Sequence, residues 1–250
     1  MSVIVSGSVV VSGSTDVGYK TSTDGLLLYL DAGNPNSYPG NGTMWYDLTT
    51  NGNDSIPQPS VTYNSNSSSF FFPGSAGSYT RFDVPQLGSA DVATIEFIFK
   101  PTNLNGAAYN VLCGFYQYSL ATPQSATGPV RLSFSTGTSG EEYLGQQTSI
   151  YLNQWHHVVA VFYKNPPTFY TSNRAWVNNS EQTFVYSGGA VNLSVQNFNY
   201  GIGRIAGAFN YDENYTPVAY YPVFKIYNRL LSQAEITNNY NYYKARFSLT

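Results

Sequence analysis

Short runs of apolar and aromatic residues, separated by turn residues at short intervals, dominate this sequence and limit the folds that it can adopt. Many short strands with frequent turns and almost no helical periodicity are typical of a β-sandwich or a β-barrel. The sequence therefore predicts an all-β protein. In chain order, the runs are GLLLYLDAG, SSFFFPG, TIEFIFKP, NVLCGFYQY, VRLSFSTG, SIYLN, HHVVAVFYK, TFYTSNRAWVNN, QTFVYSG, FNYGIGRI and YYPVFKIYNR.

One segment near the C-terminus departs from this pattern. In LLSQAEITNNYNYYKARF, Ser232 is followed three residues later by Glu235, which is the spacing of a helix capping box. The apolar positions around them recur at loosely helical intervals. We therefore predict one short helix over about residues 232–245. These apolar positions are Leu231, Ala234, Ile236 and Tyr240.

The composition excludes some classes of partner. A net charge of −3, with 10% charged residues, provides no basic footprint for nucleic acid. No apolar run is long enough to span a membrane, and the first residues lack the basic and apolar regions of a signal peptide. We expect a protein made in a cytoplasm, although so few charges suit a protein that works outside a cell. A virus particle satisfies both conditions.

The first residues nearly repeat themselves. VSGS occurs twice, and Val-rich runs broken by Ser-Gly-Ser predict a β-hairpin. An isolated hairpin is only marginally stable, so this β-arm, residues 1–23, must pair either with its own domain or with another chain. Pairing with another chain would give the arm a role in assembly. The side chains that would mediate it are Val3, Val5, Val9 and Val11.

The only two histidines, His156 and His157, are adjacent in a predicted strand. Successive side chains of a strand point to opposite faces, so the two imidazoles cannot reach one metal ion together. Both faces of this strand are mostly apolar, as in a strand buried between two layers. The pattern favours structural histidines over metal ligands or catalytic bases. The single cysteine, Cys113, lies in the apolar run NVLCGFY and is expected to be a buried small hydrophobe.

Several of these segments together resemble laminin G-like domains of the concanavalin A-like lectin/glucanase superfamily. NQWHHVVAVF is similar to the family's Trp-His-His-Val strand, and TIEFIFKPT, RAWVNN and GIGRIAG resemble further strands. FKIYNRLLSQAEITNNYN resembles the family's terminal strand and helix. GLLLYLDAGNPNSYPGNGTMWYDLTTNGND is similar to an opening found in versions from tailed phages, cyanophages especially. The resemblance covers about residues 24–246. It implies a jelly-roll sandwich of two antiparallel sheets over 24–231, with the helix and tail at 232–250.

The sequence departs from the family in its acidic residues. Many members carry Gly-x-Ile-Asp before the last strand, whereas AYYPVFKIYNR has no acid there. Glucanases of the superfamily place two carboxylates on one strand, four residues apart, with a third acid between them. Here the strand TIEFIFK carries only Glu96, and Glu141 and Glu142 are adjacent in a predicted loop. Gly-x-Ser-x-Gly is absent as well, so we expect no enzyme activity.

The resemblance points to the loop after the first strand as a binding site, because related sandwiches bind Ca²⁺ and sugars through loops at one rim. Its side-chain oxygens suit Ca²⁺, and its aromatic rings suit a sugar. A structural interpretation stays open, because Asn, Gly and Pro favour turns and Trp45 could fill the core. A less specific candidate is Asp212 with Glu213. The loop candidates are Asp31, Asn34, Asn36, Tyr38, Trp45, Tyr46, Asp47, Asn51, Asn53 and Asp54.

These observations predict a non-enzymatic structural protein of a tailed-phage virion, exposed on the particle as a capsid decoration, neck or fibre component. The expected partners are further copies of the chain and other virion proteins, with weak adhesion to a cell-surface glycan as an added role. The alternative is a dedicated carbohydrate-binding adhesin or receptor-binding module. The one candidate cofactor is Ca²⁺.

Overall fold

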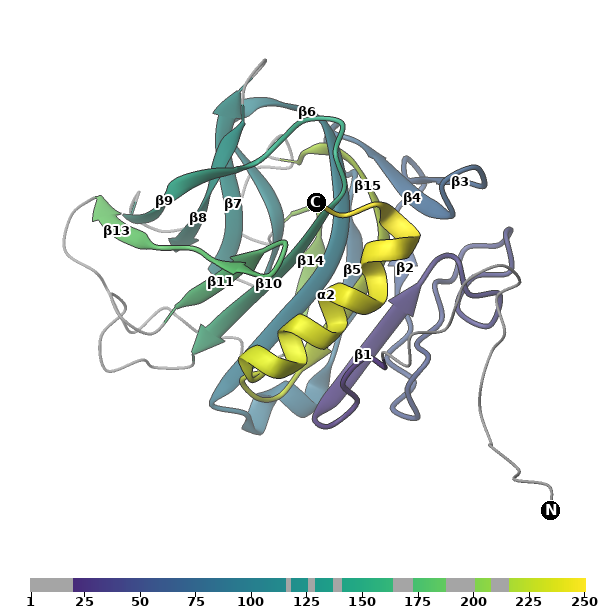
Figure 1. The fold of residues 1–250 in the computed structure, drawn as a ribbon. Coiled ribbons are helices and arrows are strands. Elements are labelled where there is room, and N and C mark those ends of the chain that lie inside the picture. Colours follow the sequence, from purple (N-terminus) through teal and green to yellow (C-terminus); the bar gives the residue numbers. More distant parts are fainter. Residues whose placement is uncertain are drawn as a thin grey trace.

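The computed structural model describes residues 20–115, 118–125, 129–136, 141–163, 173–187, 201–207 and 216–250. The described residues form two antiparallel sheets packed as a sandwich, with one helix on the outside (Figure 1). The predicted all-β sandwich with a C-terminal helix is therefore confirmed. The arm residues and the second loop candidate lie outside the described residues: Val3, Val5, Val9, Val11, Asp212 and Glu213.

The first sheet carries the helix on its outer face. Its strand order is β12-β11-β10-β6-β15, and both β1 and β4 pair with the far edge of β15, with β3 beyond β4. The strands are β1 (Leu26–Asp31), β3 (Thr62–Asn64), β4 (Ser69–Pro73), the first part of β6 (Val92–Phe115), β10 (His156–Tyr163), β11 (Arg174–Val177), β12 (Ser180–Glu181) and β15 (Val218–Tyr227).

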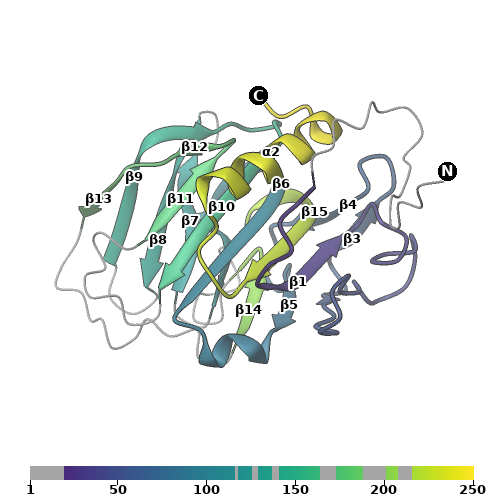
Figure 2. The ribbon, with the colours of Figure 1, turned by 60° about the horizontal axis from the view of Figure 1, so that its bottom comes forward.

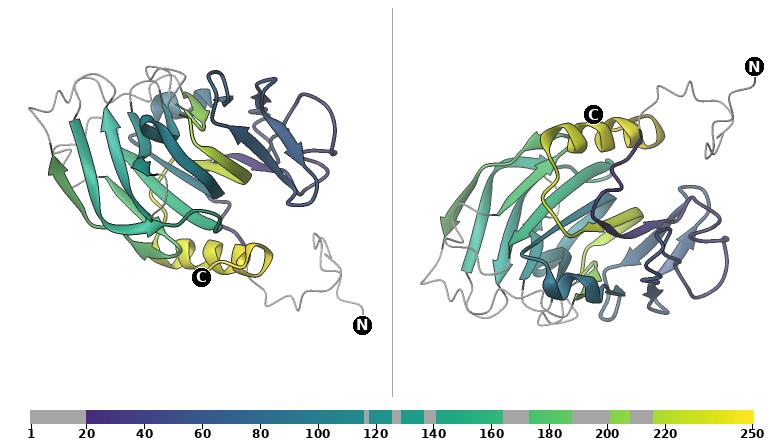
Figure 3. Two further views of the ribbon diagram at one scale, coloured as in Figure 1. Left: turned by 90° about the horizontal axis from the view of Figure 1, so that it is seen from above. Right: turned by 90° about the horizontal axis from the view of Figure 1, so that it is seen from below.

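The second sheet faces the first across the core (Figures 2 and 3). Its order is β2-β5-β14-β6-β7-β8-β9-β13, and a 3₁₀ helix, η1 (Pro85–Ser89), leads from β5 towards β6. The strands are β2 (Ile56–Pro57), β5 (Thr80–Asp83), the last part of β6, β7 (Tyr118–Ser125), β8 (Val130–Thr136), β9 (Glu141–Ile150), β13 (Phe184–Ser187) and β14 (Ile202–Ile205).

Strand β6 belongs to both sheets. The sequence predicted two separate strands, TIEFIFKP and NVLCGFYQY, but the backbone stays extended from Val92 to Phe115. The strand pairs with β10 and β15 in the first sheet and then with β7 and β14 in the second. Register shifts on both partners, next to Pro101 and after Leu104, accompany the change of sheet. Irregular pairing of this kind lets a strand bend from one sheet into the other.

The core between the sheets is rich in aromatic side chains. Phe97 packs edge-to-face against Phe99 and also contacts Tyr221 and Phe224 of β15. Strand β10 is buried on both sides, as its sequence predicts. Val158, Ala160 and Phe162 face the sandwich core, whereas the alternate positions face the helix.

Helix α2 (Gln233–Phe247) begins at a capping box, as predicted. The Ser232 side chain accepts a hydrogen bond from the backbone N–H of Glu235, and the Glu235 carboxylate accepts one from the backbone N–H of Ser232. The helix lies along the outer face of the first sheet (Figures 1 and 3). Its apolar side chains pack onto that face and complete two hydrophobic clusters. Of the described helices, none has the length and apolar character needed to cross a membrane.

Candidate functional site

The two adjacent histidines point to opposite sides of the first sheet. His156 lies on the core side, where its Nε2 is 3.0 Å from the backbone nitrogen and 2.9 Å from the carbonyl oxygen of Tyr151. His157 lies under helix α2, where its Nε2 is 2.8 Å from the Glu96 carboxylate. Burial lowers the pKa of the His156 imidazole, and the hydrogen bond to the Tyr151 carbonyl partly offsets this effect. The histidines therefore belong to two separate environments.

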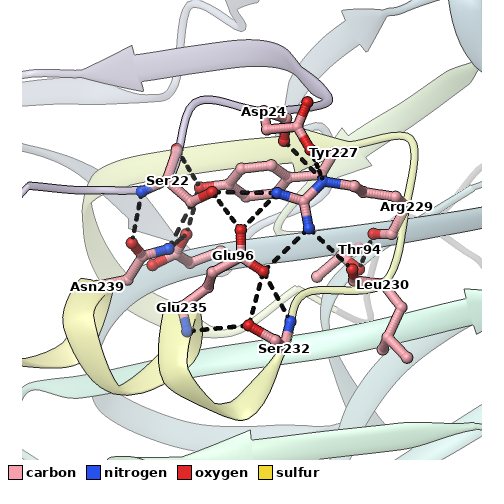
Figure 4. Close-up of polar contacts among 10 residues, drawn as sticks. All are labelled: Ser22, Asp24, Thr94, Glu96, Tyr227, Arg229, Leu230, Ser232, Glu235 and Asn239. Carbon is pink, nitrogen blue, oxygen red and sulfur yellow. Dashed lines mark hydrogen bonds and ion pairs between the residues drawn. The ribbon is translucent and has the colours of Figure 1, made fainter.

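A buried polar cluster surrounds Glu96 between the first sheet and helix α2. The carboxylate lies 2.8 Å from each of three donors: His157 Nε2, the Tyr227 hydroxyl and Asn239 Nδ2 (Figure 4 shows the last two). Lys225 Nζ lies 3.8 Å away, and both charged side chains are 0% exposed. No substrate from solvent can reach this carboxylate. The cluster joins the strands to the helix.

The predicted loop covers the open edge of β1 instead of leaving its side chains free. The Asp47 carboxylate accepts a hydrogen bond from the backbone N–H of Tyr29 at 2.9 Å, and also from the backbone N–H groups of Thr49 and Asn53. Asn51 and Asn53 donate their amide N–H groups to the carbonyl of Leu27. Unpaired groups along a sheet edge invite strand addition, and these side chains satisfy them.

Other polar candidates of the loop also make contacts within the protein. Asp31 binds the guanidinium of Arg246 through two contacts of 2.7 Å, so it fixes the helix to the end of β1. Asp54 accepts the backbone N–H of Asp47, and Asn34 accepts that of Asn36.

The aromatic candidates of the loop differ in exposure. Trp45 is 0% exposed and packs against Phe70, so its ring offers no face to a sugar. Tyr38 is also buried, and its hydroxyl donates to the carbonyl of Gly42. Only Tyr46 is exposed. In the described part of the chain, no group of three or more His, Cys, Asp or Glu side chains converges as a metal site. The binding of Ca²⁺ or a sugar by this loop stays a prediction. Most of the polar side chains of the loop already make hydrogen bonds or ion pairs within the protein.

A groove with a volume of about 340 Å³ lies elsewhere, where the end of β9 and the β9–β10 loop meet the β11–β12 hairpin. The described residues that line it carry amide, hydroxyl and aromatic groups and no Asp, Glu, Lys or Arg side chain. They are Gln147, Thr148, Ser149, Tyr151, Gln154, His156, Val177, Asn178, Ser180, Gln182 and Thr250.

Local sequence explains both walls of the groove. Asn178 and Asn179 adopt φ angles of 48° and 67° between the paired residues Val177 and Ser180. Two successive left-handed residues form the tight hairpin turn that Asn tolerates well. On the opposite wall, Asn153 has a φ of 62° and donates its backbone N–H to the carbonyl of Pro101 at 2.7 Å. Both walls are thus anchored to the sandwich.

Hydrogen bonds across the groove organise its polar groups. Ser149 donates to the Gln182 side chain at 2.7 Å, and Asn178 donates to the carbonyl of Thr250. The Tyr151 ring is 45% exposed, and its ring plane lies 23° from that of His156 beneath it. The sequence interpretation missed this site. Its only signal was the concentration of Asn, Gln, Ser and Thr in QQTSIYLNQW and VNNSEQT, which is equally typical of turns.

A match to a family model identifies the family of this chain. The model described as the concanavalin A-like lectin/glucanases superfamily matches residues 73–237, which is more than half of the chain. The chain belongs to this superfamily. A search of curated protein sequences finds no match.

Solved structures with a similar fold include longer chains, of which this chain covers only a part. Trypanosoma rangeli sialidase bound to the inhibitor DANA matches with a TM-score of 0.61 and 15% identity, over 88% of this chain and 33% of that chain. The receptor-binding domain of botulinum neurotoxin type G matches with a TM-score of 0.57 and 12% identity, over 87% and 51%. This chain therefore spans about a third to a half of the length of these chains.

A third structure comes from work on the cell entry of botulinum neurotoxin type C, which is described as dependent on two ganglioside molecules. It matches this chain with a TM-score of 0.60 and 12% identity, over 88% of this chain and 51% of that chain. Identities this low establish a shared fold and nothing more about this chain.

Proposed function

We propose that this domain is a non-enzymatic carbohydrate-binding module and that the β9–β12 groove is its binding site. The observation that carries the proposal is the lining of the groove, where side-chain amides and hydroxyls surround an exposed tyrosine ring and no described lining residue has a charged side chain. Amides and hydroxyls both donate and accept hydrogen bonds, as sugar hydroxyls do. A ring with an apolar face and a polar tip suits the mixed surface of a pyranose.

The charge of the groove selects the class of glycan. A sialylated or sulfated sugar would need a cation to balance its charge, and the described lining supplies none. The proposed ligand is therefore a neutral oligosaccharide. The similar fold of a neurotoxin whose cell entry depends on gangliosides supports a glycan partner in general. This similarity of fold does not distinguish between neutral and charged sugars as ligands.

The absence of a paired carboxylate in the described groove lining supports a binding role over hydrolysis. Most glycoside hydrolases need two carboxyl groups flanking the bond that they cleave. The lining residues include none, and Glu96 is sealed under the helix.

Glycan-array binding with two matched variants tests the proposal. Tyr151→Ala removes the exposed ring of the groove, and Tyr46→Ala removes a ring of similar exposure, 42% against 45%, from the loop that covers β1. We expect Tyr151→Ala to abolish the array signal and Tyr46→Ala to leave it intact. The opposite result would move the site to the loop. Failure of the wild-type domain to bind any neutral glycan would contradict the proposal.

The phage setting is a separate proposal that rests on the resemblance of GLLLYLDAGNPNSYPGNGTMWYDLTTNGND to tailed-phage versions of the domain. We propose that the module is displayed on a virion, as a decoration, neck or fibre component that also contacts other copies and other virion proteins. Mass spectrometry of purified particles of a phage that encodes this chain would find it at a fixed copy number. Its presence only in the lysate would argue against a virion role.

A further inference from the structure

Lys225 is an unusual residue for the interior of a β-sandwich. Its amine is 0% exposed, lies 4.7 Å and 4.8 Å from the ring centres of Tyr29 and Tyr243, and has no hydrogen-bond partner in the described structure. Its nearest polar atom among the described contacts is Glu96 Oε2, at 3.8 Å. A buried lysine held this way is not fully paired, and a structural role alone leaves its amine unexplained.

The same carboxylate oxygen holds a second nitrogen. Asn239 of helix α2 donates its Nδ2–H to Glu96 Oε2 at 2.8 Å. The lysine amine and the asparagine amide nitrogen therefore face one carboxylate oxygen from two different elements. Register explains the arrangement, because Lys225 lies directly opposite Glu96 across the β15–β6 pair, and the helix places Asn239 above them.

The carbonyl of the asparagine side chain is polarised as well. Asn239 Oδ1 accepts a hydrogen bond of 2.8 Å from the backbone N–H of Ser22, as Figure 4 shows. The Tyr227 hydroxyl also contacts the Glu96 carboxylate and lies 3.4 Å from Asn239 Nδ2. A donor aimed at a carbonyl oxygen stabilises the negative charge that appears there when a nucleophile adds. The amide of Asn239 is thus prepared for attack.

We propose that Lys225 and Asn239 form an intramolecular isopeptide bond, with Glu96 as the proton carrier. The cluster supplies a nucleophile, an electrophile, an acid/base group and an oxyanion donor, and Lys225, Asn239 and Glu96 are all 0% exposed. Neither glycan binding nor a virion setting is needed for this reaction.

The reaction balances without any further reactant. The lone pair of Lys225 Nζ adds to Cγ of Asn239, and the carbonyl electrons move to Oδ1, where the Ser22 N–H stabilises them. Glu96 takes a proton from the new C–N nitrogen and passes it to Nδ2. The Cγ–Nδ2 bond then breaks, and ammonia leaves. An amine and a primary amide become a secondary amide and ammonia, with no change of oxidation state.

The surroundings favour the reactive form of each group. Burial lowers the pKa of the Lys225 amine, so that more of it is neutral, although Glu96 and Asp31 oppose this effect. Burial by itself would raise the pKa of the Glu96 carboxyl, but the positive charge of the protonated lysine and the hydrogen bonds from His157 and Tyr227 lower it. The two hydrogen bonds persist when the amine is neutral, and they keep the carboxylate ionised. A neutral amine and an ionised base are the starting state that the reaction requires.

Intact-mass measurement of the denatured full chain tests the proposal without any mutation. We expect the mass to be lower than the sequence mass by one molecule of ammonia. Trypsin should then fail to cleave after Lys225, and should release peptide 205–229 joined to peptide 230–244, with fragment ions that place the link at Asn239. A succinimide at an Asn-Gly sequence also loses ammonia, but it leaves these peptides separate.

Two conservative variants serve as controls. Lys225→Arg keeps a cation but removes the primary amine, and should restore the full sequence mass. Lys244→Arg makes the same change at an exposed helix position and should keep the mass loss. If Lys225→Arg fails to fold, the peptide map of the wild-type chain still tests whether the bond between Lys225 and Asn239 forms. Free peptide 230–244 with unmodified Asn239, together with complete cleavage after Lys225, would overturn the proposal.

Discussion

At the scale of single residues, Asp47 shows how one carboxylate organises a loop. It accepts hydrogen bonds from three backbone N–H groups and from the Thr49 hydroxyl, one of them at the edge of β1. Hydrogen bonds to a charged group each contribute about 1.5 to 3 kcal/mol, although a shared acceptor gives less than their sum. Substitution of Asp47 should therefore lower the free energy of unfolding by a measurable amount.

We expect Asp47→Ala to lower the free energy of unfolding by about 2 to 3 kcal/mol, measured by urea denaturation, because backbone donors lose their acceptor. Asp91→Ala changes an exposed carboxylate and should stay within about 0.5 kcal/mol of the wild type. Equal effects of the two substitutions would contradict the edge-covering role. A rise in the wild-type midpoint on adding Ca²⁺, lost in Asp47→Ala, would instead assign the loop to a metal.

The buried imidazole of His156 predicts a pH dependence of the free energy of unfolding. Burial holds its folded-state pKa below the unfolded value of about 6.5, so the unfolded chain binds more protons as the solution becomes acidic. The stabilisation from a neutral His156 is complete above the unfolded pKa and is lost as pH falls towards the folded pKa. We expect the free energy of unfolding to fall with decreasing pH below about 6.5.

The variant His156→Gln isolates this effect. Glutamine keeps a polar group near the backbone of Tyr151 and does not titrate, so the decline below about pH 6.5 should become shallower. Denaturation midpoints across a pH series measure it. An unchanged pH profile in the variant would show that other groups, and not His156, cause the decline.

At the scale of elements, the docking of α2 depends on the space beside a glycine. A side-chain carbon at Gly33 would lie 2.2 Å from Nη2 of Arg246, the guanidinium that binds Asp31. We expect Gly33→Ala to displace Arg246 and to cost about 1 to 2 kcal/mol of unfolding free energy, a value reduced because the arginine is partly exposed. A double-mutant cycle with Arg246→Ala tests the cause. If Gly33→Ala costs as much without the arginine, this explanation is wrong.

The same scale shows which elements the sequence could predict. The capping box at Ser232 and Glu235 and the alternation along β10 are local patterns, and both elements were predicted for the correct physical reasons. The continuity of β6 was not predicted. Its passage from one sheet to the other depends on the strands that pair with each half, and no local pattern encodes those partners.

At the scale of the whole molecule, the sandwich was predictable and the groove was not. The jelly-roll prediction followed from strand runs and family-like motifs over most of the chain. The groove brings together the segments 147–156 and 177–182 with Thr250, and each is unremarkable alone. The sequence interpretation chose the loop at 31–54 as a binding site because its polar residues lie close together in the sequence. Their role at the edge of β1 became clear only from the hydrogen bonds that they make.

The central claim is that the groove binds a neutral glycan, and NMR titration of the isotope-labelled domain tests it most directly. The titrant is the strongest neutral oligosaccharide from the array. We predict saturable chemical-shift changes at backbone amides of residues 147–156 and 177–182, and none beyond noise at residues 31–54. Shifts confined to the loop, or no saturable shift anywhere, would contradict the account.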